Sequence, residues 1–150
     1  MRVVIQRVSS ASVTIEGQVR GEITNGFLIL LGIEAADTVE DIDWLTGKIS
    51  KMRVFDDSEG LMNKSLTDTN GSALVVSQFT LHANTKKGNR PSFIRAARPE
   101  QAEPMYQTFL QQLGERIAHP CQSGEFGADM QVSLVNDGPV TIIIDSKNRE

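Results

Sequence analysis

The run of residues 27–33 constrains the fold most, because its side chains are apolar at successive positions, interrupted only by Gly32. A strand that is wetted on one face alternates apolar and polar residues, whereas a strand covered on both faces does not. The run is far shorter than the ~18 apolar residues that would indicate a membrane span. It therefore predicts a buried strand with other elements packed on both of its faces, in a protein that does not enter a membrane.

Two longer segments have the apolar spacing of amphipathic helices. The first begins near Asp37, which Glu40 follows three residues later in a loose capping-box pattern. Its apolar residues then recur at steps of three and four, namely Val39, Ile42, Leu45, Ile49 and Met52. The second segment, residues 99–118, carries a stripe formed by Ala102, Met105, Tyr106, Phe109, Leu113 and Ile117. Because proline interrupts a helix, this second helix is expected either to begin near Pro104 or to bend there.

Short strands are expected where the chain alternates in polarity or is apolar between turn residues. These segments are residues 2–8, 11–15, 53–55, 73–81, 129–135 and 140–145. Residues 146–150 are expected to form a frayed tail. Strands outnumber helices and both helices must cover the sheet, so we expect a layered, mixed α/β (α+β) fold with two main helices.

Size and charge narrow the class of protein. A chain of 150 residues has the common size of one domain, and we expect residues 1–150 to form a single domain. The single cysteine, Cys121, has no internal disulfide partner, and residues 1–7 lack the apolar stretch of a signal peptide, which indicates a cytosolic protein. The net charge of −4 argues against a broad nucleic-acid-binding surface. Residues 70–98 nevertheless contain no acidic residue and five basic ones, Lys86, Lys87, Arg90, Arg95 and Arg98. This segment is either a local phosphate-binding patch or a solvated loop.

The sequence has no arrangement typical of metal or nucleotide-driven catalysis. Its soft and imidazole ligands are Cys121, His82 and His119, which lack the close pairing of zinc sites. No Gly-rich turn of the required spacing follows a strand and opens a helix. We therefore expect neither a metal nor a cofactor.

A hydrolase with a hydroxyl nucleophile is one alternative. Ser77 follows a buried strand, but the Gly-x-Ser-x-Gly elbow is absent. If the strand continues, Thr80 and His82 point to the same face with Cα atoms ~6.5 Å apart, so that the imidazole can reach the hydroxyl. Otherwise, His82 is a surface residue just beyond the strand.

Two motifs lie at the ends of apolar runs. Residues 77–81 (Ser-Gln-Phe-Thr-Leu) follow the run 73–76, and residues 136–141 (Asn-Asp-Gly-Pro-Val-Thr) open the last run of the chain. Viewed alone, the second motif is an ordinary turn. In this order, and in a chain of this length, the pair resembles the D-aminoacyl-tRNA deacylase family, and the match covers residues 1–144. The resemblance implies a β/β/α layered domain with barrel-like sheets.

The resemblance also implies a reaction, which is hydrolysis of the ester between an amino acid and the 3′-terminal ribose of tRNA. Such an ester is already activated, so placing a water molecule and stabilising the oxyanion suffice without a protein nucleophile. In the family, backbone N–H groups face the carbonyl oxygen and the ribose 2′-hydroxyl helps to place the water. Carried over to this chain, the catalytic segment is Ser77, Gln78, Phe79 and Thr80, with Thr80 positioning the substrate rather than attacking it.

The Gly-Pro bond of the family is cis, and its carbonyls enter the pocket of the partner subunit, where they bind the amino group of a D-amino acid and exclude an L side chain. Carried over, Gly138 and Pro139 select the substrate, which implies a homodimer and tolerance of glycine. Arg7 resembles the residue that braces this loop. Phe126 and Met130 resemble the apolar faces that pack on the terminal adenine, and the basic residues around 90–93 then meet phosphates of the tRNA acceptor end.

Two rival functions remain open at this point. One is a non-catalytic module that binds the aminoacylated end of tRNA. The other is a small-molecule esterase that uses Thr80 and His82.

Overall fold

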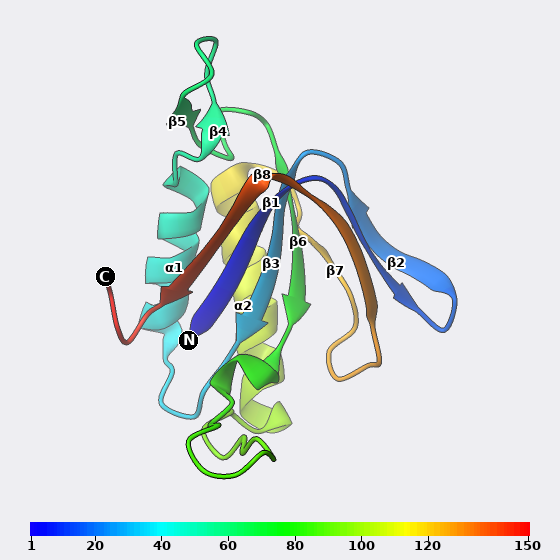
Figure 1. Ribbon diagram of the computed structural model, residues 1–150, viewed down its shortest axis with the longest axis vertical. Coiled ribbons are helices and arrows are strands. Elements are labelled where there is room, and N and C mark those ends of the chain that lie inside the picture. Colours follow the sequence, from blue (N-terminus) through cyan, green and yellow to red (C-terminus); the bar gives the residue numbers. More distant parts are fainter.

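The computed structural model describes residues 1–150, and its main sheet is strongly curved, with both helices packed on one side of it (Figure 1). The main path of the sheet is β2-β1-β3-β6-β7, and β8 also pairs with β1. Its strands are β1 (Arg2–Ile15), β2 (Gln18–Ile23), β3 (Gly26–Gly32), β6 (Ser72–Ser77), β7 (Gln122–Ser123) and β8 (Gln131–Asp145). The helices are α1 (Val39–Lys51) and α2 (Pro99–Ile117), and a separate hairpin is formed by β4 (Phe55–Asp56) and β5 (Met62–Lys64). The predicted layered α+β class is confirmed.

Strand β3 is buried on both faces, as its apolar run predicts. Phe27, Ile29 and Leu31 join the larger core cluster, which also contains most of the apolar stripes of both helices. The predicted stripe residue Val39 is an exception, because it lies at the start of α1 and is 60% exposed. Leu28 points the other way, into a smaller cluster within the curved part of the sheet. Because β3 pairs antiparallel with β1 and parallel with β6, its end lies next to the end of β6.

The first and last strands are longer than predicted. The two strands expected at 2–8 and 11–15 are one strand, β1, and the two expected at 129–135 and 140–145 are one strand, β8. The pairing of β1 with β8 shifts register on both sides of Val8. Such bulges let a strand bend without ending, so the polar residues between the apolar runs are accommodated within continuous strands.

The predicted cap of α1 is off by one residue. The N-cap is Thr38, whose backbone N–H donates to Asp41 Oδ2 at 2.8 Å, so the capping box is Thr38 and Asp41 rather than Asp37 and Glu40. Asp37 instead accepts the N–H of Glu34 at 2.8 Å. Because the Asp37 carboxylate is engaged by the backbone N–H of Glu34, it does not cap the first turn of α1, and the predicted cap at Asp37 is wrong.

The second helix begins at Pro99. The N–H groups of the first turn have no partner within a helix, so a proline at this position removes no hydrogen bond. The helix continues through Pro104, so the start predicted near Pro104 is wrong, whereas a bend there stays a prediction. The strand predicted at 53–55 is β4, which begins only at Phe55. Neither helix is long and apolar enough to cross a membrane.

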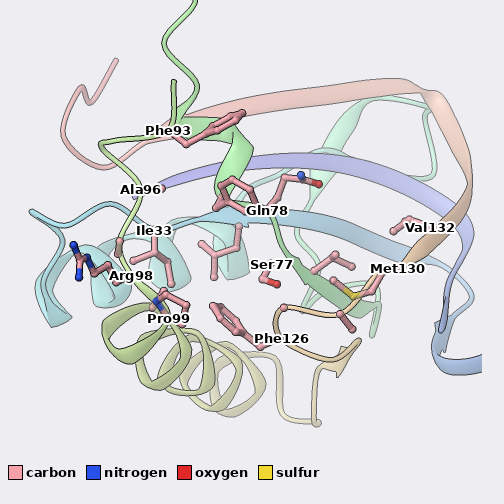
Figure 2. Close-up of a pocket in the computed structure, with 17 residues that line it drawn as sticks. Ile33, Ser77, Gln78, Phe93, Ala96, Arg98, Pro99, Phe126, Met130 and Val132 are labelled. Carbon is pink, nitrogen blue, oxygen red and sulfur yellow. The ribbon is translucent and has the colours of Figure 1, made fainter. Parts of the chain in front are cut away.

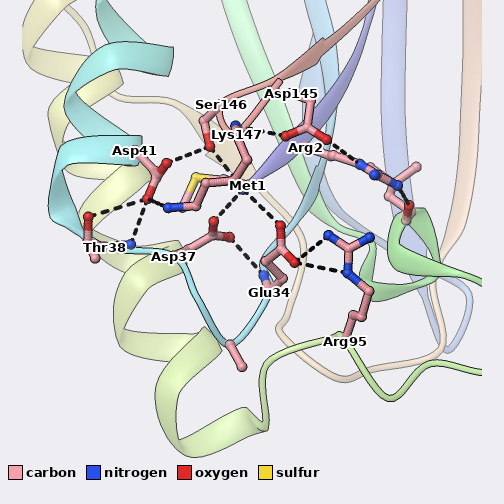
Figure 3. Close-up of polar contacts among 12 residues, drawn as sticks. Met1, Arg2, Glu34, Asp37, Thr38, Asp41, Arg95, Asp145, Ser146 and Lys147 are labelled. Atoms are coloured by element: carbon pink, nitrogen blue, oxygen red, sulfur yellow. Dashed lines mark hydrogen bonds and ion pairs between the residues drawn. The ribbon is translucent and has the colours of Figure 1, made fainter. Parts of the chain in front are cut away.

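The end of the chain is not frayed at Ser146 and Lys147, contrary to expectation (Figure 3). Ser146 is buried, donates its hydroxyl to Asp41 Oδ1 at 2.6 Å and accepts a bond from the Met1 ammonium at 3.0 Å. Lys147 Nζ donates to Asp41 Oδ2 at 2.8 Å. Burial alone would raise the pKa of Asp41, but the hydrogen bonds from Lys147, Ser146 and Thr38 hold it far below its usual value. These bonds tie residues 146 and 147 to the start of α1.

Candidate active site

A pocket of about 560 Å³ opens beside the ends of β3 and β6 (Figure 2). Its floor is apolar and includes Leu31, Ile33 and Val76. Its walls come from the segment before β8, with Phe126 and Met130, and from residues 93–102, which run into α2. Such a size and lining are usual for sites that bind small organic groups.

The Ser-Gln-Phe-Thr-Leu motif lies at the rim of this pocket. Ser77 ends β6, and Ser77, Gln78 and Phe79 all line the pocket. The chain then turns into a short 3₁₀ helix, Phe79–His82, so the strand predicted to reach residue 81 ends at Ser77. The first bond of this turn runs from the N–H of Leu81 to the carbonyl of Gln78, at 3.2 Å. The N–H groups of Phe79 and Thr80 precede that bond and have no partner within the turn.

Gln78 differs from the next two residues in how its backbone is used. Its N–H donates to the carbonyl of Leu31 at 2.8 Å, which continues the pairing of β3 with β6. The backbone donors that the turn leaves free at the pocket rim are therefore those of Phe79 and Thr80.

The geometry does not support a Thr80–His82 dyad. Thr80 is exposed, and its hydroxyl accepts a bond from the side-chain amide of Gln78 at 2.6 Å. His82 is 1% exposed, so the expectation of a surface residue is wrong, and neither ring nitrogen has a hydrogen-bond partner in the protein. In a 3₁₀ helix, residues two positions apart point in different directions. The shared face required for the dyad exists only in a strand.

The buried imidazole should make stability pH-dependent. Burial lowers the pKa of His82, whereas an unfolded chain releases that proton near pH 6.5. Below about pH 6.5 the unfolded state therefore binds more protons than the folded state, so the free energy of unfolding should decrease as the pH falls. Denaturant titrations of wild type and His82→Gln between pH 7.5 and 5 test this. We expect a smaller decrease in the variant, and parallel curves would contradict the assignment.

The Asn-Asp-Gly-Pro segment lies within β8, where the chain bends over the end of the sheet. The Gly138–Pro139 peptide bond is cis, as the resemblance implies, and Gly138 has a φ of +138°. Asn136 closes the bend, because its Oδ1 accepts the N–H of Val140 at 3.0 Å and its Nδ2 donates to Thr141 Oγ1 at 3.0 Å. Gly138 and Pro139 are exposed.

The side chain of Arg7 holds this bend of β8 in place. Its side chain is 7% exposed. Nε donates to the carbonyl of Asp137 at 2.9 Å, and Nη1 donates to the carbonyl of Val54 at 2.7 Å and to Asp56 Oδ1 at 3.3 Å. The guanidinium therefore joins the bend of β8 to the base of the β4–β5 hairpin.

Within one chain, the predicted site residues fall into two groups. Ser77, Gln78, Phe79, Phe126 and Met130 line the pocket, with Thr80 just outside it. Arg7, Gly138 and Pro139 lie elsewhere. Arg7 pairs with Phe27 at one end of β3, whereas Ser77 pairs with Leu31 near the other end, roughly 13 Å away along the strand. Figure 1 shows the same separation, with the bend of β8 at the top and the turn that follows β6 near the bottom.

The lining holds almost no titratable group. Arg98 is its one ionisable residue, and no carboxylate, imidazole, lysine, cysteine or tyrosine lines the pocket. Cys121 lies outside the lining, and burial raises the pKa of its thiol to about 12, which makes it unreactive. No group of three or more His, Cys, Asp or Glu side chains is arranged to hold a metal ion. The pocket wall at residues 96–102 was not predicted, because Arg98 stood out only as part of the basic segment and residues 99–102 only as the start of an amphipathic helix.

Known proteins match the whole length of this fold. A family model described as D-Tyr-tRNA(Tyr) deacylase matches residues 4–145. Proteins named D-aminoacyl-tRNA deacylase from Flavobacterium johnsoniae and Opitutus terrae are 63% and 61% identical, and each match covers all of both chains. A solved structure of a c-Myc DNA unwinding element binding protein is 44% identical with a TM-score of 0.90, over 97% of this chain and 98% of the other.

A solved structure of a probable eukaryotic D-amino acid tRNA deacylase is only 16% identical, but its TM-score of 0.82, over 95% of this chain and 97% of the other, shows the same fold. Sequence and fold thus agree over the full length of the chain, and the chain belongs to the D-Tyr-tRNA(Tyr) deacylase family.

Proposed function

We propose that the protein hydrolyses the ester bond of D-aminoacyl-tRNA and releases the free D-amino acid and tRNA. The names of the full-length relatives support this substrate. The observation that carries the chemistry is the rim of the pocket, where the turn leaves the N–H groups of Phe79 and Thr80 free while no general base lines the cavity. Backbone donors of this kind stabilise the oxyanion that forms when water attacks an ester.

The mechanism divides the work between the protein and the RNA. Phe79 and Thr80 donate their N–H groups to the developing oxyanion, and the backbone of Gln78 is held in place by its bond to Leu31. Ser77 has no imidazole or carboxylate beside it in the pocket, which argues against a serine nucleophile. The 2′-hydroxyl of the terminal ribose then supplies the group that places the water. Phe126 and Met130 provide apolar faces for the terminal adenine.

Selection of the D-amino acid is assigned to the backbone of Gly138 and Pro139, acting in the pocket of a partner subunit. Two observations support this arrangement. The two residues are exposed and lie away from the pocket of their own chain. Large apolar side chains are also exposed on the same strand, with Val135 at 56% and Ile143 at 73%, as expected of a face that a second copy covers. A filter made of backbone also admits glycine, so clearance of mischarged glycyl-tRNA in the cytoplasm belongs to the same proposal.

The central experiment compares hydrolysis of matched D-Tyr-tRNA and L-Tyr-tRNA by the purified protein, with its mass in solution measured by sedimentation equilibrium. We expect rapid hydrolysis of the D-ester only, by a dimer. A non-catalytic module is the second candidate, favoured by the name of the 44% identical protein, which describes binding to a DNA element. Retention of D-Tyr-tRNA without turnover would support that candidate and refute the hydrolase.

Substitution of Thr80 by alanine separates positioning from nucleophilic attack. The variant keeps its backbone N–H and loses one neutral hydroxyl, a change of about 0.5–1.5 kcal/mol, so single-turnover hydrolysis of D-Tyr-tRNA should slow by roughly tenfold at most. Loss of a nucleophile costs up to about 10⁶-fold in kcat. Complete inactivity of a folded variant that still binds the substrate would show that Thr80 is the attacking group.

A further inference from the structure

An aromatic pair at one side of the pocket has side chains that the proposed reaction does not use. The rings of Phe79 and Phe93 meet edge to face with their centroids 5.2 Å apart, and both residues line the pocket. Phe79 is 55% exposed and Phe93 is half-buried. Figure 2 shows Phe93 on the opposite side of the pocket from Phe126 and Met130. The pocket therefore has two separate apolar faces, one for the terminal adenine and one without an assigned ligand.

The segment that carries Phe93 is held firmly against the end of β3. The N–H of Ala35 donates to the carbonyl of Arg95 at 3.1 Å, and the N–H of Ala97 donates to the carbonyl of Ile33 at 2.9 Å. Arg95 Nη2 also donates to Glu34 Oε2 at 2.7 Å, which Figure 3 shows among the contacts of Glu34. A wall fixed in this way is preorganised for a ligand.

This wall carries one arginine without an ion pair. Residues 70–98 contain no Asp or Glu. Arg95 is neutralised by Glu34, but Arg98 at the pocket rim makes no ion pair, and its side chain points outward in Figure 2. Aromatic rings on which bases can stack, combined with basic side chains, are the means by which proteins bind single-stranded nucleic acid, and this wall has one such arginine.

We propose that this side of the pocket binds the penultimate nucleotide of an unpaired RNA 3′ end. Its base stacks on Phe93 and Phe79, and Arg98 contacts the phosphate that links it to the terminal nucleoside. The inference rests on the proposed function, which places the terminal adenine against Phe126 and Met130. Stacking of this kind does not depend on which base is present. It does require an exposed base face, so a nucleotide within a duplex is excluded.

The test compares two esters of D-tyrosine, one with adenosine and one with the 3′ end of the trinucleotide CCA. Wild-type protein should have the higher kcat/KM for the trinucleotide. Phe93→Leu, which removes the π-face, should lower the ratio of the two kcat/KM values by roughly tenfold, within the range for loss of one stacked base, and Phe93→Tyr should restore it. Ile94→Ala is the matched control, because Ile94 is 91% exposed and does not line the pocket. An unchanged ratio in Phe93→Leu would overturn the proposal.

A second measurement separates this inference from the hydrolase itself. If the wild type cleaves neither ester, the proposed function fails, but anisotropy of 5′-fluorescein-labelled CCA still tests the aromatic pair. Weaker binding by Phe93→Leu than by Ile94→Ala supports the site, and equal binding refutes it. Arg98→Gln should also reduce the slope of log affinity against log salt by roughly 0.7, the value for one single-strand phosphate contact. An unchanged slope would remove Arg98 from the site.

Discussion

Arg7→Leu is expected to reduce hydrolysis of D-Tyr-tRNA by at least about 100-fold, because the bend of β8 loses the brace that fixes it. A displacement of about 1 Å at a positioning element is enough for a loss of that size. Leucine also leaves the carbonyls of Asp137 and Val54 without the donors that now reach them at 2.9 and 2.7 Å. The Val54 carbonyl is buried, whereas the Asp137 carbonyl is partly exposed to water, so the free energy of unfolding should fall by about 1–3 kcal/mol, the cost of one unsatisfied buried group.

Arg7→Lys is the informative control for this prediction. Lysine keeps the charge but presents a compact ammonium, which cannot span two carbonyls in the way the guanidinium does. We expect it to recover part of the stability and little of the activity. Denaturant unfolding and kcat/KM for D-Tyr-tRNA, measured for both variants under conditions where each is folded, check the prediction. Wild-type kinetics in Arg7→Leu would show that the bend is positioned by other contacts.

Gly138→Ala is expected to reduce activity on D-Tyr-tRNA by about 100-fold and to narrow the discrimination between D and L esters. The φ of +138° is unfavourable for any L residue with a side chain. An added Cβ would also lie 2.8 Å from Val140 Cγ2, 3.0 Å from the backbone N of Val140 and 3.1 Å from Arg7 Nη2. Relief of these contacts must move the backbone that is proposed to select the substrate, at a cost of about 1–3 kcal/mol.

Gly17→Ala provides the matched control. Gly17 also has a positive φ, +76°, but no atom lies within 4 Å of its added Cβ, and it is part of the exposed turn between β1 and β2. This variant should lose some stability and keep its D/L ratio. Parallel assays of both variants with D-Tyr-tRNA and L-Tyr-tRNA are decisive. An unchanged rate and an unchanged ratio in Gly138→Ala would remove the glycine from the selection mechanism.

The sequence predicted elements well where one periodicity extends over many residues. The apolar run of β3 and the stripes of both helices, except for the exposed Val39, are confirmed, because burial on one or two faces dictates the residue at nearly every position. The prediction failed where a local hydrogen bond occupies a side chain that the pattern assigns to another role. Asp37 precedes α1 and looks like its cap, yet it binds Glu34, and Thr38 caps the helix instead. Likewise, Ser9 and Ser10 suggest a break in β1, but bulges carry the strand past them.

The sequence named the candidate site residues but not the backbone geometry around them. The motif after β6 was predicted to continue the strand. In the structure, the N–H of Gln78 makes the last bond to β3, and the residues that follow form a 3₁₀ turn. That turn buries His82 and exposes Thr80, which no alternation rule anticipates. The distance between the pocket and Gly138 depends on the register of β1, β3 and β8, and sequence periodicity carries no information on it.

Two of the three acceptors that Arg7 contacts are main-chain carbonyls, at positions 54 and 137. A bond to a main-chain carbonyl depends on the path of the backbone and not on the side chain at that position. Val54 can therefore be exchanged for another residue without loss of its contact to Arg7, whereas Asp56 and Asp137 also meet the guanidinium through their carboxylates.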